Sequence, residues 1–236
     1  MKKDNCKVSR RAFLKSTAFT TLFTGFYGTG YSSFIPEEEK EKRRIQLAEA
    51  GPMLPPVPAI LLTVNGENDS PDEISVVWTF IIEGNPPQIG ISVHKHHIAQ
   101  KLVRQHKQFV LNVPTVDIMR AFDTVDMNSS KVDDKYELTG LTRGKAVTVD
   151  APTVEESPIH VECKVFNTIS VPPARTMFLA DVVATTVHEG VCDKNGKLIV
   201  PAVSFFGMTA GSGEFYTMGK LVGHIGKSIG RNDIKY

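Results

Sequence analysis

Apolar residues in the middle of the chain recur with a period of two, which is typical of β-strands that bury one face. The clearest example is the range Gln88–His94, where Ile89, Ile91 and Val93 alternate with Gly and polar residues. Apolar, β-branched or aromatic runs predict five further strands. These lie at residues 58–64, 74–82, 108–114, 159–171 and 176–188.

A helical pattern follows the alternating strand. Ile98, Ala99, Leu102 and Val103 form one apolar stripe at helical spacing, and the helix is expected to begin near His96 or His97. Many strands joined by turns, with only one or two short helices, predict a mainly β protein built as an antiparallel barrel. No GxGxxG opens a helix after a strand and no GxxxxGK[ST] occurs, so neither dinucleotide nor P-loop binding is expected.

The start of this helix carries unusual side chains. Ser, Thr, Asp or Asn normally caps the unpaired N–H groups of a helix N-terminus, but here the chain has His94, Lys95, His96 and His97. Cations are unfavourable beside the positive end of the helix dipole. A bound anion would satisfy the N–H groups and pair with these side chains, and Ser92 would add a hydroxyl. The pattern therefore indicates a phosphate or carboxylate site.

Two other interpretations of this cluster stay open. The first is an exposed helix start capped by water, with solvated histidines. The second is a metal site, because imidazole is a common metal ligand and His94, His96 and His97 are close in sequence. Metal sites usually have three or four ligands in defined geometry, and no HExxH or paired CxxC completes a set.

The N-terminus has the parts of an export signal. The stretch Ser9–Lys15, SRRAFLK, carries a twin-arginine signature, and the mildly apolar run 18–26 follows it. That run is shorter than the roughly 20 apolar residues of a membrane-spanning helix. We expect a twin-arginine leader over residues 1–33, a charged linker over 34–52 and a globular domain over 53–236.

Charge and cysteine content narrow the functional classes. Residues 1–33 hold six of the 27 basic residues and one of the 26 acidic ones, which leaves 21 against 25 and a net charge of −4. The basic charge thus belongs to the leader, and no nucleic-acid partner is expected. Cys163 and Cys192 remain in the mature chain and either pair in an oxidising compartment or stay as two free thiols.

Several motifs in order carry a family resemblance. They are PAILLTV, ISVVWTF, NPPQIGISV, FVLNVP, DDKYELTGL and PIHVECKV. In this order and spacing, from about Pro58 to about Gly219, the chain resembles the flavin reductase-like, FMN-binding split-barrel family, which includes flavoredoxin. The resemblance implies a split β-barrel, FMN as cofactor and a homodimer with FMN near the interface.

The resemblance also assigns residues to the flavin. One strand would lie along the isoalloxazine, largely through backbone groups: Ser75, Val76, Val77, Trp78 and Thr79. A second segment would hold the phosphate at the helix start and offers Ser92, His94, Lys95, His97 and Ala99. Lys135 would reach the flavin or its phosphate, or else be a solvated loop cation. Trp78 is equally well explained as a core or interface aromatic.

One departure from the family pattern concerns the phosphate segment. Relatives commonly have an Arg and a Thr there, where this chain offers His97 and Ala99 or their neighbours. Histidine is neutral much of the time near pH 7 and holds a dianion less firmly than the Arg fork. Lower FMN affinity, or compensation by Lys95 and Lys101, is therefore expected.

Leader and cofactor together suggest a function. FMN is made in the cytoplasm, so a protein that binds it non-covalently must fold before export. We therefore expect an FMN-dependent oxidoreductase outside the cytoplasm that takes electrons from NAD(P)H or another reductant. No acid–base set is evident, and the catalytic residues stay undefined. A non-enzymatic flavin electron carrier, or a metal-binding protein that uses the histidines, are the alternatives.

Overall fold

The computed structural model describes residues 46–52, 54–67, 70–128, 134–209, 212–225 and 230. The chain divides into a unit Met1–Ala48 and a compact unit Glu49–Tyr236, which holds all the elements below. The expected leader lies outside the described residues. In the part of the chain that is described, no helix has the length and apolar character needed to cross a bilayer.

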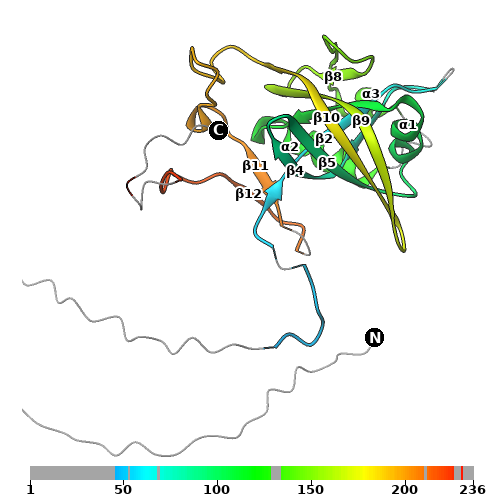
Figure 1. The fold of residues 1–236 in the computed structure, drawn as a ribbon, viewed down its shortest axis with the longest axis horizontal. Coiled ribbons are helices and arrows are strands. Elements are labelled where there is room, and N and C mark those ends of the chain that lie inside the picture. The colour runs from blue at the N-terminus through cyan, green and yellow to red at the C-terminus, as the bar shows by residue number, and fades with distance from the viewer. Residues whose placement is uncertain are drawn as a thin grey trace, which may run out of the picture. The chain divides into compact units, whose positions relative to one another are not determined.

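A seven-stranded antiparallel sheet forms the centre of the compact unit, in the order β3-β2-β6-β9-β10-β5-β4 (Figure 1). Its strands are β2 (Leu61–Val64), β3 (Glu73–Val76), β4 (Trp78–Gly84), β5 (Pro87–His94), β6 (Gln108–Val113), β9 (Ile159–Val171) and β10 (Arg175–Val187). This confirms the mainly β, antiparallel fold class.

The two outer strands of this sheet, β3 and β4, are consecutive in the chain and separated only by Val77. The sheet therefore closes on itself as a barrel. The Val77 N–H donates to the carbonyl of Ile60 at 3.3 Å, and its side chain is 4% exposed in the core. The expectation of one continuous strand over 74–82 is wrong. Before Val77 the chain pairs with β2 and after it with β5, and no turn residue in the sequence around Val77 indicates this change of partner.

Smaller sheets lie beside the barrel. β1 (Val57–Pro58), β11 (Phe206–Met208) and β12 (Phe215–Thr217) form one, and β7 (Arg143–Lys145) pairs with β8 (Pro152–Val154). The predicted strand over 58–64 is thus divided between β1 and β2, which belong to different sheets.

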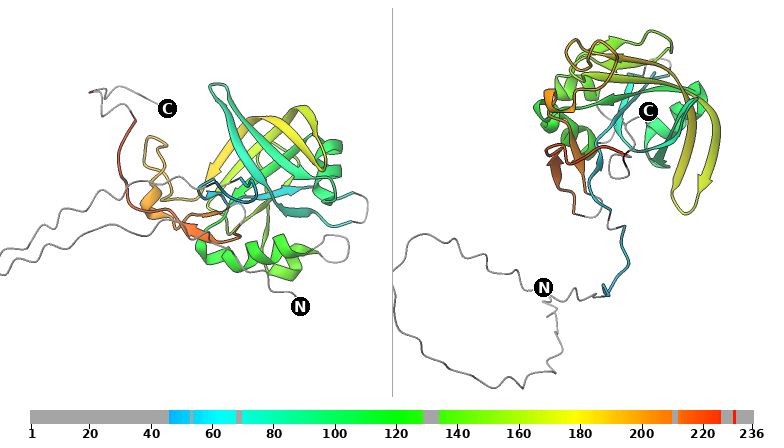
Figure 2. Two further views of the ribbon diagram at one scale, coloured as in Figure 1. Left: turned by 90° about the horizontal axis from the view of Figure 1, so that it is seen from below. Right: turned by 60° about the vertical axis from the view of Figure 1, so that its left-hand side comes forward.

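The helices are α1 (Ile98–His106), α2 (Met119–Met127) and α3 (Lys135–Thr139), with short 3-10 turns η1 (Val116–Ile118) and η2 (Val200–Ala202). Helix α1 begins where the sequence predicted, and it buries Ala99, Leu102 and Val103 against the barrel core. Helices α2 and α3 lie together along one side of the strands (Figure 2). Phe122 of α2 packs edge-to-face on Phe206 and Phe215, with ring centroids 5.3 and 5.7 Å apart.

The alternation predicted for β5 holds from Ile91 to Val93, which are buried on either side of the partly exposed Ser92, but Ile89 is only half-buried and Gly90 is buried beneath the Phe80 ring. On β9 the simple alternation fails at Glu162, which is fully buried. Its carboxylate accepts hydrogen bonds from the N–H groups of Val147, Thr148 and Val149 at 2.9, 2.7 and 3.1 Å. A covering loop with three donors makes this burial of a charge possible.

Candidate functional site

A pocket of about 330 Å³ lies where β3, the start of α1, the end of α2 and the start of α3 meet. Its lining residues are Ser75, Val76, His96, His97, Ile98, Val125, Asp126, Met127, Asn128 and Lys135. Ser75, Val76, His97 and Lys135 were all singled out from the sequence as cofactor-binding residues. The fold thus brings together parts of the strand, the helix start and the lysine that the resemblance had assigned separately.

His97 is the N-cap residue of α1, with extended backbone (φ −76°, ψ 134°) and no side-chain cap for the helix. Its own N–H donates to the carbonyl of His94 at 3.0 Å. His97 is solvent-accessible, but partial desolvation at the pocket lowers its pKa, and the positive charge of Lys135 lowers it further. His97 is therefore neutral near pH 7 while the pocket contains no anion. The uncapped first turn supplies backbone donors to the pocket.

Lys135 is 5% exposed, so the alternative of a solvated loop cation is wrong. Its Nζ lies 3.2 Å from Oε1 of Glu73 and donates to the carbonyl of Ile74 at 2.9 Å. The hydroxyl of Ser75 donates to the same Oε1 at 2.6 Å. The lysine charge is therefore already paired with a buried carboxylate at the edge of the pocket.

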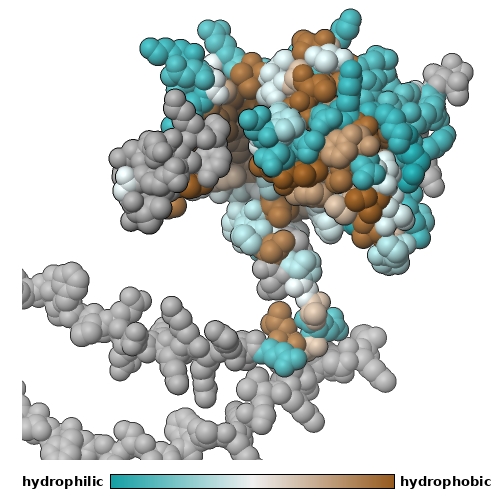
Figure 3. Space-filling model, viewed as in Figure 1, coloured by the Kyte–Doolittle hydropathy of each residue, from teal (hydrophilic) through white to brown (hydrophobic). Residues whose placement is uncertain are grey.

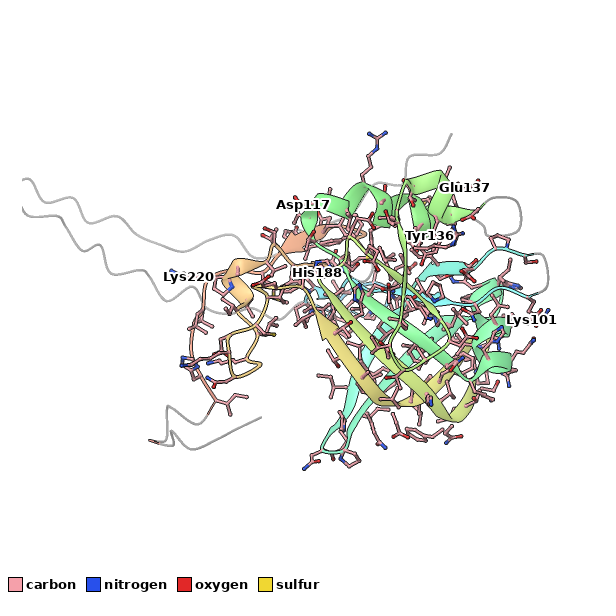
Figure 4. The ribbon with its side chains drawn as sticks, turned by 90° about the horizontal axis from the view of Figure 1, so that it is seen from above. Lys101, Asp117, Tyr136, Glu137, His188 and Lys220 are labelled. Carbon is pink, nitrogen blue, oxygen red and sulfur yellow. The ribbon has the colours of Figure 1, made fainter. Side chains whose placement is uncertain are left out.

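Helix α3 packs one of its sides into the protein and exposes the other, and this packing fixes the position of Lys135. The Asp134 carboxylate caps the helix by accepting from the N–H of Tyr136 at 2.9 Å. Tyr136 is buried and its hydroxyl donates to the carbonyl of Thr153 at 3.1 Å, whereas its neighbour Glu137 is exposed (Figure 4). The cap and the buried tyrosine fix the helix start against β3.

Trp78, Thr79 and Ser92 lie on neighbouring strands, outside the lining of this pocket. Trp78 pairs with Ser92 across β4 and β5, is 41% exposed, and is therefore no core residue. The Arg175 guanidinium stands 3.8 Å from the centre of the Trp78 indole and donates to the Ser92 carbonyl at 3.1 Å. Thr79 donates to the carbonyl of Gly90 at 3.0 Å.

The remaining predicted residues do not line the pocket. Val77 and Ala99 pack in the barrel core, so only their backbone groups are available to a ligand. Lys95 is directed to the β9–β10 turn, where its Nζ donates to the carbonyl of Pro173 at 3.2 Å. His94 accepts from the N–H of His96 at 3.3 Å through Nδ1.

Three functional candidates escaped the sequence analysis: Glu73, Asp126 and Arg175. Asp126 follows Val125 on α2, a helix whose apolar spacing at Phe122 and Val125 would have revealed it. Asp126 is solvent-accessible, but partial desolvation beside the pocket raises its pKa, and the proximity of His97 partly counters this shift. For Glu73 and Arg175 the local sequence carries no comparable pattern, because their partners come from distant segments.

The metal interpretation gains no ligand set from the geometry. Among the residues that the structure describes, no three His, Cys, Asp or Glu side chains are placed to share one metal ion. The ring centroid of His94 lies 5.1 Å from the ring centroid of His96 and 5.9 Å from that of His97.

A comparison with protein families matches residues 55–205 to the flavin reductase like domain. The chain belongs to this family. The match covers β1 to β10 and every residue of the pocket, so pocket and barrel are parts of the family domain.

Solved structures agree with the flavin reductase-like fold. The chain is similar to flavoredoxin of Desulfovibrio vulgaris (Miyazaki F), with a TM-score of 0.72, 24% identity, and coverage of 78% of this chain and 99% of that one. An FMN-binding protein from Thermus thermophilus aligns with a TM-score of 0.64 at 16% identity, covering 77% and 98%. An uncharacterized protein of Pyrococcus abyssi is 25% identical over 54% of this chain and 73% of its own length.

Proposed function

We propose that this flavin reductase-like protein is an FMN-dependent oxidoreductase of the flavoredoxin type. The family and the FMN-binding neighbour support the cofactor that the sequence predicted. The observation that carries the proposal is the pocket itself, where an uncapped helix start, a buried lysine and the outermost strand of the sheet, β3, converge. Its volume is at the lower end of the range typical of cofactor sites, about 300–1,000 Å³.

The residues present fit the phosphate end of FMN. The N–H groups of the first turn of α1 are donors for a phosphate, as helix N-termini commonly are. His97 and Lys135 add side-chain donors from two other directions. Ser75 and Val76 form the pocket wall from which the chain continues through Val77 into Trp78, so the isoalloxazine would follow that strand.

When bound, FMN supplies the redox chemistry: it accepts electrons from a reduced donor and passes them to an acceptor. The chain's own residues bind and orient the group. The donor is NAD(P)H or another reductant, and in the non-enzymatic alternative the protein only carries electrons between partners.

The test starts from the visible spectrum of the purified protein and chromatographic identification of any chromophore released by heat. Bound or readily added FMN, followed by anaerobic reduction with NADH, NADPH and dithionite in parallel, is the expected result. Steady consumption of a nicotinamide supports the enzyme, whereas reversible reduction without turnover supports the carrier. A colourless protein that also fails to bind added FMN overturns the proposal.

We also propose that the leader exports the protein after folding through the twin-arginine route, which would explain how a non-covalent cytoplasmic cofactor leaves the cell. The test is the double substitution Arg10→Lys, Arg11→Lys in a host with working twin-arginine export. Accumulation of the variant in the cytoplasm is expected, and unchanged export of the variant would overturn this part of the proposal.

A further inference from the structure

Among the residues that the structure describes, the charges of the pocket lining do not sum to a strong anion site. The ammonium of Lys135 is held at 3.2 Å by Glu73, with both side chains almost fully buried. Asp126 adds a second carboxylate to the lining. Against these, His97 and the neighbouring His96 are the remaining side chains of the described lining that can carry a positive charge.

A phosphate monoester carries nearly two negative charges above pH 7. Placing such a group beside Asp126 and a pre-neutralised lysine costs electrostatic free energy unless one more positive charge appears. His97 stands at the helix start where the phosphate would bind, and its imidazole gains a proton at little cost once the anion is present. The proton and the phosphate thus stabilise one another.

We propose that the pocket takes up a proton on His97 together with the phosphate of its flavin, and that Asp126 sets how strongly binding depends on that proton. This inference rests on the proposed function. Proton uptake by His97 makes the preference of the pocket for FMN over riboflavin depend on pH. A site built on a permanently charged arginine would show no such dependence.

The charged and titratable groups around His97 come from every element beside it. They are His94 on β5, Glu73 on β3, Asp126 on α2, Lys135 on α3, Arg175 on β10 and the adjacent His96. In the pocket without anion, partial desolvation and the cations Lys135 and Arg175 lower the pKa of His97. A bound phosphate raises the pKa of His97 again. FMN binding therefore takes up a proton at any pH between the pKa of His97 in the unliganded pocket and its pKa in the complex.

The direction of the pH effect follows from this linkage. FMN affinity falls as pH rises between the pKa of His97 in the unliganded pocket and its higher pKa in the complex. Because one proton is taken up, the fall is at most tenfold per pH unit. Between pH 7 and 9 the phosphate is already almost fully a dianion, so its own titration contributes little. Riboflavin has no phosphate, and its affinity should stay constant over the same range.

The experiment measures the dissociation constants of FMN and riboflavin by flavin fluorescence, with the flavin-free full chain, from pH 7 to pH 9. We expect the ratio of the two constants to change by several-fold to tenfold in favour of FMN toward pH 7. Calorimetry of FMN binding at pH 7.5 in two buffers of different ionisation enthalpy should show net proton uptake.

Variants assign the effect to residues. His97→Arg should bind FMN with an affinity that no longer depends on pH, because guanidinium stays charged, and His97→Gln should weaken FMN and also lose the slope. Asp126→Asn should tighten FMN several-fold and leave riboflavin unchanged. Asp123→Asn, which removes the same charge from the same helix but outside the pocket lining, should do neither.

The outcomes separate this inference from the proposed function. FMN binding with a pH-independent ratio to riboflavin, no proton uptake, or an unchanged slope in His97→Arg overturns the inference while the flavoprotein stands. Failure of both flavins to bind at every pH overturns both.

Discussion

Among single residues, Lys135 and Glu73 show most clearly how the site is tied to the stability of the fold. Both side chains are about 95% buried, and the pair links the first residue of α3 to the first residue of β3. Removing one partner of a buried ion pair leaves the other charge buried without its counter-ion, which costs far more than the pair contributes by itself. The lysine therefore has a structural role beside any contact with a ligand.

This gives a stability prediction. Lys135→Met should lower the free energy of unfolding by about 3–5 kcal/mol, measured by urea denaturation. The matched control is Lys101→Met, whose partner Glu67 lies 2.6 Å away but whose own side chain is 70% exposed. That variant should lose no more than about 1 kcal/mol. Similar losses in both variants would contradict the argument.

The two cysteines of the described domain are free thiols, which excludes a disulfide between them in this structure. Burial raises the pKa of Cys163 to about 12, and the adjacent Glu162 carboxylate adds to the shift. Only the thiolate reacts readily with alkylating reagents. Cys192 is partly exposed.

Labelling should therefore be selective. In the native protein at pH 8, iodoacetamide should modify Cys192 and leave Cys163 intact, and both should react in denaturant, as read by peptide mass mapping. A native peptide in which Cys163 and Cys192 are joined, or rapid native labelling of Cys163, would refute this expectation.

At the scale of elements, Glu162 links strand β9 to the loop that precedes β8. Its buried carboxylate accepts three backbone N–H groups of residues 147–149, so one side chain orders a loop with no regular structure of its own. Hydrogen bonds to a charged acceptor contribute more than neutral ones.

Glu162→Ala should accordingly destabilise the protein by about 2–3 kcal/mol. Amide hydrogen exchange at residues 147–149 should accelerate at the same time, whereas Glu189→Ala, at an exposed loop position, should change neither quantity measurably. Retained protection of these amides in Glu162→Ala would show that the loop is held by other contacts.

For the whole molecule, the outer face of β4, β5, β10 and β9 exposes large apolar side chains: Trp78, Phe80, Ile82 and Ile169 are 39–41% exposed. Figure 3 shows patches of hydrophobic side chains among hydrophilic ones on the visible face of the molecule. The Phe80 ring lies over Gly90, where any Cβ would approach it to 2.2 Å, so the face is shaped by the absence of a side chain. Apolar patches of this kind are common at subunit interfaces.

We propose that a second copy of the chain covers this face, as the family resemblance implied. Light scattering coupled to gel filtration should give the mass of a dimer. Ile169→Glu should shift it toward the monomer, whereas Val147→Glu, at a 71%-exposed position in the loop next to β7, should leave the dimer intact. A monomeric wild-type protein at micromolar concentration would refute the proposal.

Local patterns were sufficient for most strands and for the start of α1. β9 and β10 lie within one residue of the ranges predicted from the sequence, because their apolar periodicity is long and bounded by turns. Shorter elements escaped prediction: the break at Val77 lies in a stretch without turn residues, and α3 has only five residues.

By itself, the sequence determined most of the long strands, the barrel class and an unusual helix start at His97, since these depend on neighbours a few residues apart. The resemblance added Ser75 and Lys135 as flavin-binding expectations. Only the tertiary structure decided that Lys135 is paired with Glu73, 62 residues away, and that Asp126 lies beside His97. The net charge of a pocket depends on which distant segments the fold brings together. A local sequence pattern therefore cannot predict that charge.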